Sequence, residues 1–310
     1  MPLSDLLARS AAAVVGAALL SYALCPLLAK AAPRLGLMDA PDEDRKRHGR
    51  PIPLVGGIAV WLAAGFALFL TDRAALLAWG WIGLMGGVGL TDDLVGWRAG
   101  PKLALQFGVS CVLAAIALAV SPMEGGDGEA VVALCGFLLA LVVLVNAFNF
   151  TDNSNGQCAG LAVVSLGAEG LVLGARGGES SGFFPLIFAA AFLGFLIWNY
   201  PSARVFLGDC GSHLAGCAVA FAGLTVVEDA GSSVRIADFL GLGLLAFVPL
   251  LDFAVAVGGR LLRGQAPWKG DMTHLFHRLV ARGVKPAAAV AALWLAALVA
   301  SALGALILLR

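Results

Sequence analysis

A pair of adjacent carboxylates is the first feature of the sequence that could do chemistry. Asp92 and Asp93 close an apolar run as T-D-D, and Lys102 opens the next run within P-K-L-A-L-Q. Neighbouring carboxylates at a membrane edge repel each other and are costly to desolvate, so a divalent cation, an arginine or a lysine is expected beside them. The simpler explanation is a solvated helix end. Because ionisable groups at membrane depth are mostly functional, we predict a site here.

A second polar stretch follows the apolar run 131–145 and reads N-A-F-N-F-T-D-N-S-N-G-Q over residues 146–157. Amides and carboxylates at the end of a membrane helix need partners in protein, in water or on a ligand. The stretch therefore predicts either a hydrated loop between helices or a polar binding site. We take Asn149, Asp152 and Asn155 as its candidate site residues.

Gly208 and Asp209 belong to a third candidate, V-F-L-G-D-C-G-S, at residues 205–212. Glycine lets the backbone approach a ligand closely, and a helix N-terminus offers free N–H groups to an anion. Asp209 beside such a cradle could hold a metal ion that bridges phosphate oxygens. The simpler explanation is an ordinary helix start with Ser212 as its cap.

Two histidines and an arginine form the fourth candidate, within W-K-G-D-M-T-H-L-F-H-R-L at residues 268–279. His274 and His277 are three residues apart, so they share a face if this segment is helical. With Arg278 they indicate a site for an anion or a pyrophosphate. A zinc site is disfavoured because no third nitrogen or thiolate ligand lies nearby. Asp252, in an apolar run, is expected either to face the polar centre or to pair with an arginine.

We expect membrane helices to hold these candidate residues in place. The chain has 310 residues, of which 60% are hydrophobic and 13% charged, and its mean hydropathy of +0.91 exceeds that of a soluble core protein. A net charge of zero gives no indication of nucleic-acid binding. The six cysteines form no CxxC pair, so we expect buried thiols. We predict an all-α integral membrane protein with one domain over 1–310.

Spans need about 20 mostly apolar residues each. We count ten, at 10–30, 54–71, 74–91, 103–121, 129–147, 158–174, 182–199, 213–227, 236–258 and 286–309. An even number puts both termini on one side, and fifteen of the twenty lysines and arginines fall at the other side. The positive-inside rule therefore predicts periplasmic termini and places all four candidate stretches at the cytoplasmic face.

Taken together, the candidate residues favour phosphoryl transfer between a soluble nucleotide and a lipid. Carboxylate and amide oxygens without thiolates select Mg²⁺, with Mn²⁺ as the alternative. Asp209 and Asp152 are the candidate ligands, and Asp152 is also a candidate catalytic group. A hard cation, anion-binding helix ends and a membrane rim suit the transfer of a phosphoryl group.

These stretches together resemble the polyprenyl-phosphate N-acetylhexosamine-1-phosphate transferase family, a branch of glycosyltransferase family 4. The resemblance covers about residues 48–279. It rests on H-x-x-P-x-P-x-x-G-G, T-D-D followed by P-K-L-x-x-Q, N-A-x-N-x-x-D, N-Y-P-x-A-R-V-F-x-G-D-x-G-S, P-L-x-D and D-x-x-H-L-x-H-R-L. Each motif is weak singly, and their order and spacing make the signal specific.

The resemblance implies a reaction and its partners. A UDP-N-acetylhexosamine, with N-acetylglucosamine as the expected sugar, reacts with polyprenyl (undecaprenyl) phosphate in the presence of magnesium. The products are a polyprenyl-diphosphate sugar and UMP, in the first membrane step of cell-surface polysaccharide synthesis. The implied location is the inner membrane of a bacterium, and a homodimer is a further expectation.

The resemblance also assigns roles by motif. Asp92 and Asp93 are similar to the acidic pair that positions or deprotonates the lipid phosphate. Asp209 is similar to the magnesium-binding aspartate. The remaining matches imply contacts to phosphates, nucleotide or diphosphate, from Lys102, Asn149, Asn155, Gly208, His274, His277 and Arg278.

Three positions depart from the family pattern. Asn153 replaces a glycine, Asn155 replaces an aspartate, and Phe276 stands where relatives often carry a histidine. Asparagine keeps an oxygen ligand and removes a negative charge, so metal affinity or sugar choice is expected to differ.

Two alternatives remain open. The muramoyl-pentapeptide transferase of peptidoglycan synthesis usually carries a tighter triple-histidine cluster. A secondary transporter would show mid-membrane polar residues and an inverted repeat. In this sequence the triple-histidine cluster is absent, the polar stretches gather at one rim of the membrane, and no repeat is evident.

Overall fold

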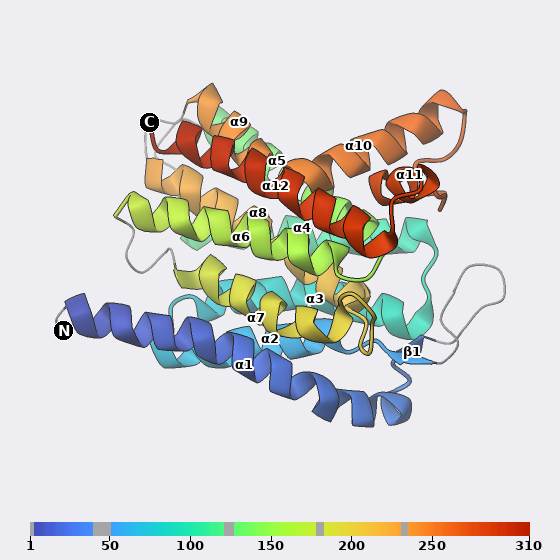
Figure 1. The fold of residues 1–310 in the computed structure, drawn as a ribbon. Coiled ribbons are helices and arrows are strands. Elements are labelled where there is room, and N and C mark those ends of the chain that lie inside the picture. The colour runs from blue at the N-terminus through green and yellow to red at the C-terminus, as the bar shows by residue number, and fades with distance from the viewer. Residues whose placement is uncertain (1–2, 40–50, 121–126, 178–182, 231–234) are drawn as a thin grey trace.

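The computed structural model describes residues 3–39, 51–120, 127–177, 183–230 and 235–310, and in them the chain is almost entirely helical (Figure 1). His48, in the first family motif, lies outside the described residues. The elements are α1 (Leu3–Leu35), β1 (Met38–Asp39), β2 (Ile52–Pro53), α2 (Gly56–Thr71), α3 (Leu76–Val95), α4 (Ala99–Val120), α5 (Asp127–Thr151), α6 (Gln157–Ala175), α7 (Phe183–Asn199), α8 (Gly208–Ala230), α9 (Ile236–Leu245), α10 (Phe247–Leu262), α11 (Leu275–Ala281) and α12 (Pro286–Leu308). The predicted all-helical architecture is confirmed, apart from one small antiparallel pair of strands, β1 and β2.

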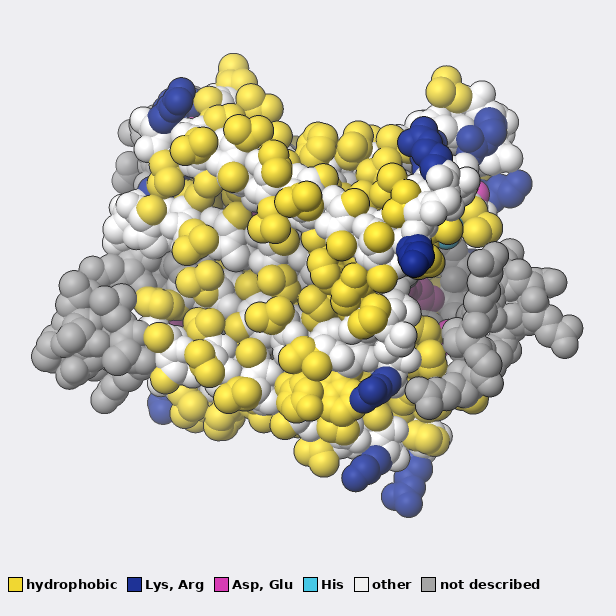
Figure 2. Space-filling model, viewed as in Figure 1, with side chains coloured by type: hydrophobic (Ala, Val, Ile, Leu, Met, Phe, Trp, Pro, Cys, Tyr) yellow, Lys and Arg dark blue, Asp and Glu magenta, His cyan; other side chains and the backbone are white. Residues whose placement is uncertain are grey.

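Long apolar sequences explain the helices. In the described part of the chain, five helices are long and apolar enough to cross a membrane, or six if the bent pair α9 and α10 counts as one crossing. Shorter apolar helices lie at Gly56–Thr71, Cys135–Thr151 and Phe183–Asn199. Figure 2 shows hydrophobic side chains covering the middle of one face, as lipid contact requires. Ten crossings remain a prediction.

Helix α8 lies at the centre of the bundle and packs on α2, α3, α5 and α6. Glycine makes the closest approach possible: a Cβ built at Gly89 of α3 would lie 2.1 Å from the Asp209 carbonyl oxygen. Small residues at such crossings are how membrane helices approach one another. The start of α8 is thereby held directly against the end of α3.

The predicted ninth span, 236–258, is wrong as a single helix, because it breaks at Ala246 into α9 and α10, which meet at 85°. Pro249 has no N–H, so the carbonyl of Leu245 loses its partner one turn along the helix. Ser165 of α6 donates to that carbonyl at 2.8 Å, and Ser301 of α12 at 3.3 Å. Neighbouring helices thus satisfy the break, and α10 leaves the bundle at an angle (Figure 1).

The two ends of the bundle differ in what they carry. The start of α1 and the end of α12 lie at the same end in Figure 1. The small sheet, α11 and the far end of α10 lie at the opposite end. This second end also collects the C-termini of α3 and α5 and the start of α8, as the contacts below show.

Candidate functional site

Lys102 lies between two carboxylates that come from different helices. Its Nζ is 2.7 Å from Asp92 Oδ2 and also donates to Asp209 Oδ2. Asp92 is in the last turn of α3, Lys102 in the first turn of α4 and Asp209 in the first turn of α8. The side chains are 12%, 14% and 29% exposed, respectively, so the group is open to solvent on one side. The expected cation beside the acidic pair is therefore Lys102.

Asn149 of α5 completes the environment of Asp209. Its Nδ2 donates to Asp209 Oδ1 at 2.8 Å and to Ser212 Oγ at 3.0 Å. Both oxygens of Asp209 therefore have partners from other helices. Ser212 does not cap α8 as predicted, because the helix begins a turn earlier, at Gly208.

Asp93 takes a different place from its neighbour Asp92. Its two carboxylate oxygens accept the backbone N–H groups of Asp209 at 2.8 Å and Cys210 at 3.0 Å. A Cβ at Gly208, where φ is +75°, would lie 2.7 Å from Asp93 Oδ2. The N–H groups expected to receive a ligand anion are thus taken by a protein carboxylate. Asp93 anchors the start of α8 and so positions Asp209.

Asp152 lies in the turn after α5 and adds a fourth acidic group to Asp92, Asp93 and Asp209. Burial, followed by the negative charges of Asp209 and Asp93, raises its pKa well above the usual aspartate value. The Asp152 backbone N–H donates to the Asn149 carbonyl at 3.2 Å. The polar stretch at the end of α5 therefore belongs to the same centre as the carboxylates of α3 and α8.

A second cluster forms where α10 meets α11. Asp252 is buried, and its Oδ2 is 2.8 Å from His274 Nδ1 while its Oδ1 accepts the Leu275 N–H at 2.6 Å. One carboxylate thus orients the imidazole and satisfies the start of α11. Of the two alternatives for Asp252, pairing with an arginine is wrong: its partner in the described structure is His274.

Arg260 holds the loop between α10 and α11. It is only 2% exposed, and it donates to the Pro267 carbonyl at 2.6 Å and to Asp271 Oδ1 at 2.9 Å. Burial raises the pKa of Asp271, but hydrogen bonds from Arg260 and Thr273 outweigh it and lower that pKa to about 2. From the sequence, Arg260 is one of several further cationic candidates, with Arg204, Arg263 and Lys269, most of which we expect to be positive-inside residues. The signal that could have found Arg260 is an arginine inside an apolar helix.

Phe150, the residue after Asn149, joins the two clusters. Its ring is edge-on to His274, with the centroids 5.7 Å apart, and the Arg260 guanidinium carbon lies 5.0 Å from its centroid. The His274 and His277 ring centroids are 5.9 Å apart. Arg278 donates from Nε to the Thr273 carbonyl at 2.8 Å. The two predicted histidines therefore lie together, and Arg278 bonds to the residue before His274, which precedes α11 rather than lying within it.

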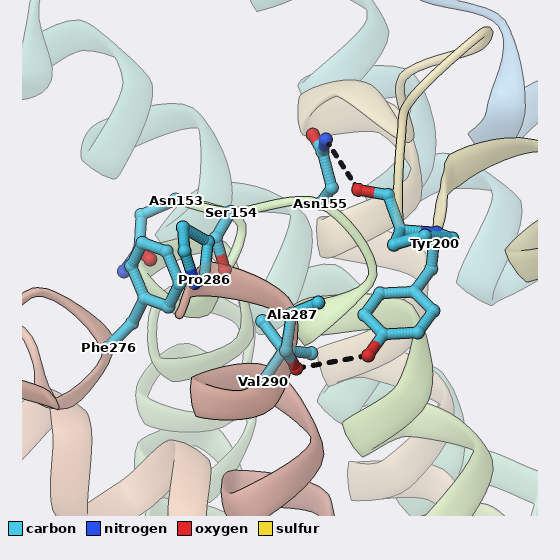
Figure 3. Close-up of a pocket in the computed structure, with 9 residues that line it drawn as sticks. Asn153, Ser154, Asn155, Tyr200, Phe276, Pro286, Ala287 and Val290 are labelled. Carbon is cyan, nitrogen blue, oxygen red and sulfur yellow. Dashed lines mark hydrogen bonds between the residues drawn. The ribbon is translucent and has the colours of Figure 1, made fainter. Parts of the chain in front are cut away.

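A pocket of about 210 Å³ opens beside the turn that follows α5 (Figure 3). Asn155 Nδ2 donates to the Pro201 carbonyl at 3.2 Å, and the Tyr200 hydroxyl donates to the Ala287 carbonyl at 3.0 Å. The pocket is lined by Asn153, Ser154, Asn155, Tyr200, Pro201, Phe276, Pro286, Ala287 and Val290. All three positions that depart from the family pattern therefore share one cavity. Tyr200 belongs to a quoted family motif but was given no site role there, and the contribution of α12 had no signal in the sequence.

The donor set at the first cluster fits a hard divalent cation. In the described part of the chain, no three His, Cys, Asp or Glu side chains are grouped closely enough to hold a metal by themselves. Mg²⁺ keeps several waters and takes only one or two protein carboxylates, and Asp209 with Asp152 would supply that number. The ammonium of Lys102 between two carboxylates shows that this position favours positive charge.

The fold and this site define an all-helical membrane protein with a centre of carboxylates and a lysine at one end of its bundle. The family model described as "Glycosyl transferase family 4" matches residues 75–227, which span α3 to α8 and hold that centre. The chain is 31% identical over 308 residues to the decaprenyl-phosphate N-acetylglucosaminephosphotransferase of Mycobacterium tuberculosis, covering 87% of this chain and 76% of the relative. The corresponding protein of Mycobacterium leprae is also 31% identical, over 310 residues, covering 87% and 77%.

A relative from Escherichia coli also carries N-acetylglucosamine and a polyprenyl phosphate in its name. The undecaprenyl-phosphate alpha-N-acetylglucosaminyl 1-phosphate transferase of Escherichia coli is 30% identical over 290 residues, covering 89% of this chain and 78% of the relative. The chain belongs to glycosyl transferase family 4, and the resemblance drawn from the motifs is confirmed.

Proposed function

We propose that this protein transfers N-acetylglucosamine 1-phosphate from UDP-N-acetylglucosamine to a polyprenyl phosphate, releasing UMP. The names of its relatives, which act on decaprenyl and undecaprenyl phosphate, support this choice of acceptor and sugar. The observation that carries the proposal is Lys102 between Asp92 and Asp209 at one end of an apolar bundle. A lipid phosphate can reach that place from the bilayer, and a nucleotide sugar can reach it from water.

The placement in the membrane follows from the charges. We infer ten crossings, periplasmic termini and a cytoplasmic active site in the inner membrane of a bacterium. Support comes from the lysines and arginines, which the sequence concentrates at the end opposite the termini. The bend between α9 and α10 is compatible with one crossing by the pair. A homodimer stays an expectation.

The residues of the first cluster have separate tasks in this reaction. Asp209 and Asp152 would hold Mg²⁺, with Mn²⁺ as the alternative, and the bound cation would supply charge neutralisation to the diphosphate oxygens. Lys102 donates to a phosphate oxygen as its contacts to the carboxylates loosen. Asp92, released from Lys102, orients the lipid phosphate or takes its proton. Asp93 keeps Asp209 in place through the backbone of α8.

The bond changes balance without a further reactant. An oxygen of the lipid phosphate forms a bond to the phosphorus attached to the sugar. The bond from that phosphorus to the bridging oxygen of the nucleotide breaks, and UMP leaves with the electron pair. Charge accumulates on the phosphoryl and leaving oxygens, which is where Lys102 acts. His274, His277 and Arg278 are proposed to contact the nucleotide or its diphosphate, across Phe150 from the carboxylates.

The alternatives are now less favoured. A secondary transporter does not agree with membership of a glycosyl transferase family. The relatives reported above are named for N-acetylglucosamine, which disfavours the muramoyl-pentapeptide transferase.

An assay of UMP release tests the proposal. Purified protein is mixed with Mg²⁺, polyprenyl phosphate and a panel of UDP-sugars that includes UDP-N-acetylglucosamine and the muramoyl-pentapeptide donor. We expect UMP with UDP-N-acetylglucosamine and only when the lipid phosphate is present. Release with the muramoyl donor alone would favour the muramoyl-pentapeptide transferase instead. No release from any donor would overturn the enzymatic assignment.

A further inference from the structure

A second layer of polar side chains lies one helical turn deeper in the bundle than the proposed active centre. Gln106 follows Lys102 by one turn of α4, and His213 follows Asp209 by one turn of α8. Gln106 Nε2 is 2.6 Å from His213 Nε2, so the pair Gln106–His213 repeats the pair Lys102–Asp209 one turn below. The same two helices are therefore joined twice along one face.

Helix α5 contributes to both layers as well. Asn149 donates to Asp209 in the upper layer, and Asn146, about one turn back, donates from Nδ2 to Gln106 Oε1 at 2.9 Å in the lower layer. Three helices, α4, α5 and α8, thus meet in two stacked polar layers. The upper layer consists of Lys102, Asn149 and Asp209 with Asp92, and the lower layer consists of Gln106, Asn146 and His213.

The hydrogen-bond directions in the lower layer are determined by one backbone group. The carbonyl of Val142 can only accept, so the Asn146 atom 2.8 Å from it is the amide nitrogen. This nitrogen faces Gln106 Oε1, which leaves the Gln106 NH₂ to donate to His213. His213 Nε2 must then be unprotonated, and the ring is a neutral imidazole. The lower layer therefore places no additional charge beneath Lys102.

Burial distinguishes Gln106 and His213 from the upper layer, whereas Asn146 is half-buried. Gln106 and His213 are fully buried, whereas Lys102, Asp92 and Asp209 are partly exposed. A buried amide that loses its partner is costly, so the lower layer tolerates little sliding or rotation of α4 against α8. The upper layer is open to water on one side, so its polar groups can be hydrated if the helices shift.

We propose that Gln106, Asn146 and His213 are positioning residues that fix α4, α5 and α8 in the register at which Lys102 and Asn149 meet Asp209. The expected effect on turnover rests on the proposed function. The geometric part of the inference, that the lower layer holds Lys102 in place, does not depend on the proposed function. Gln106 and His213 touch no substrate in this account.

The test compares two substitutions at one position. His213→Leu fills the space but leaves the Gln106 amide without an acceptor, whereas His213→Gln offers a carbonyl oxygen that can replace Nε2. Ser110→Ala is the matched control: Ser110 is buried on α4, and its hydroxyl donates only to the Gln106 backbone carbonyl of its own helix, at 2.7 Å. The purified full-length variants are first compared by thermal unfolding in detergent.

Two readouts keep the positioning role separate from the proposed reaction. The first is kcat for UMP release, which we expect to fall about tenfold or more in His213→Leu with little change in KM, and to recover largely in His213→Gln. The second needs no substrate. Modification of Lys102 by a small amine-reactive reagent, read by peptide mass spectrometry against exposed Lys269, should rise several-fold in His213→Leu and stay low in His213→Gln and Ser110→Ala.

The outcomes distinguish the possibilities. If wild-type protein releases no UMP but Lys102 becomes reactive in His213→Leu, the proposed function fails and the positioning role stands. If His213→Leu keeps both kcat and the protection of Lys102, the positioning role is overturned. If His213→Leu does not fold, Gln106→Asn replaces it, because the shorter side chain withdraws the amide from His213. A drop in kcat and a gain in Lys102 reactivity in that variant support the proposal, and their absence overturns it.

Discussion

At the scale of single residues, two adjacent aspartates have different surroundings. Asp92 pairs with Lys102 in the partly open centre, whereas Asp93 accepts backbone N–H groups at the start of α8. Their identical side chains and adjacent positions gave no way to separate them. Consecutive residues of a helix point about 100° apart, so only the position of α8 decides which aspartate meets its backbone.

Asp209 is the residue whose charge the centre needs most. Asp209→Asn keeps the size of the side chain and removes the charge that pairs with Lys102 and would hold a cation. We expect kcat for UMP release to fall by at least about a hundredfold, in folded protein. The control is Asp238→Asn in α9. It removes another ion-paired carboxylate, whose Oδ1 lies 2.8 Å from a guanidinium nitrogen of Arg235. Wild-type turnover by Asp209→Asn would remove the metal assignment.

Asn155 tests whether the pocket in Figure 3 belongs to the donor site. Asn155→Asp restores the family pattern, but it removes the donor to the Pro201 carbonyl and adds a negative charge. We expect KM for the nucleotide sugar to change about fivefold, with a smaller change in kcat. Asn155→Ala, which removes the hydrogen bond and adds no charge, separates the two causes. Unchanged KM in both variants would place the pocket outside the substrate site.

At the scale of elements, the site depends on how closely α3 approaches α8. Only a residue without a side chain fits between the end of α3 and the Asp209 carbonyl, and Asp93 then bonds across the contact. The bend between α9 and α10 has a comparable effect at the second cluster, because it directs α10 and carries Asp252 to the start of α11. Helix ends and crossings, more than helix interiors, thus set the geometry of both clusters.

Two glycines of α3 provide a matched pair. A Cβ at Gly89 would lie 2.1 Å from the Asp209 carbonyl oxygen, whereas a Cβ at Gly87 meets nothing within 4 Å. We expect Gly89→Ala to lose about 1–3 kcal/mol of stability and most activity, because α3 and α8 must separate. Gly87→Ala should be neutral or more stable by up to about 1 kcal/mol. Thermal unfolding in detergent and UMP release measure both, and equal behaviour of the two variants would contradict the close approach.

At the scale of the whole molecule, the bundle brings polar residues from distant parts of the chain to one end and leaves an apolar middle (Figure 2). The termini lie at the other end (Figure 1). Such a molecule can join a lipid-borne phosphate and a water-borne nucleotide at one membrane surface. The positive-inside rule predicts its orientation in the membrane, and the orientation predicts which residues a reagent can reach from outside the cell.

Cysteine labelling in intact cells tests the orientation. In a cysteine-free background, Arg310→Cys should react with a membrane-impermeant thiol reagent supplied from outside. Lys269→Cys, in the loop before α11, should react only after the membrane is permeabilised. Labelling of Lys269→Cys in intact cells would reverse the orientation, and labelling of both would contradict ten crossings.

The sequence was enough to predict the helical membrane class, the family and most residues of the first cluster. These depend on composition and on residue types in fixed spacing, which a linear chain displays. The sequence also predicted a cation beside the acidic pair, and Lys102 lies beside Asp92. It placed a cap at Ser212 and a single helix at 236–258, and both were wrong because backbone partners from other helices decide where a helix begins or breaks.

The three-dimensional fold was needed to reveal the different contacts of Asp92 and Asp93, the burial of Arg260 and the pairing of Asp252 with His274. It alone showed the polar layer of Gln106, Asn146 and His213 beneath the centre. The physical reason is the same in each case. A polar group inside an apolar bundle is costly without a partner. For most of these residues the partner lies on another helix, at a distance along the chain that no local pattern encodes, and for Arg260 it lies in the loop after its own helix.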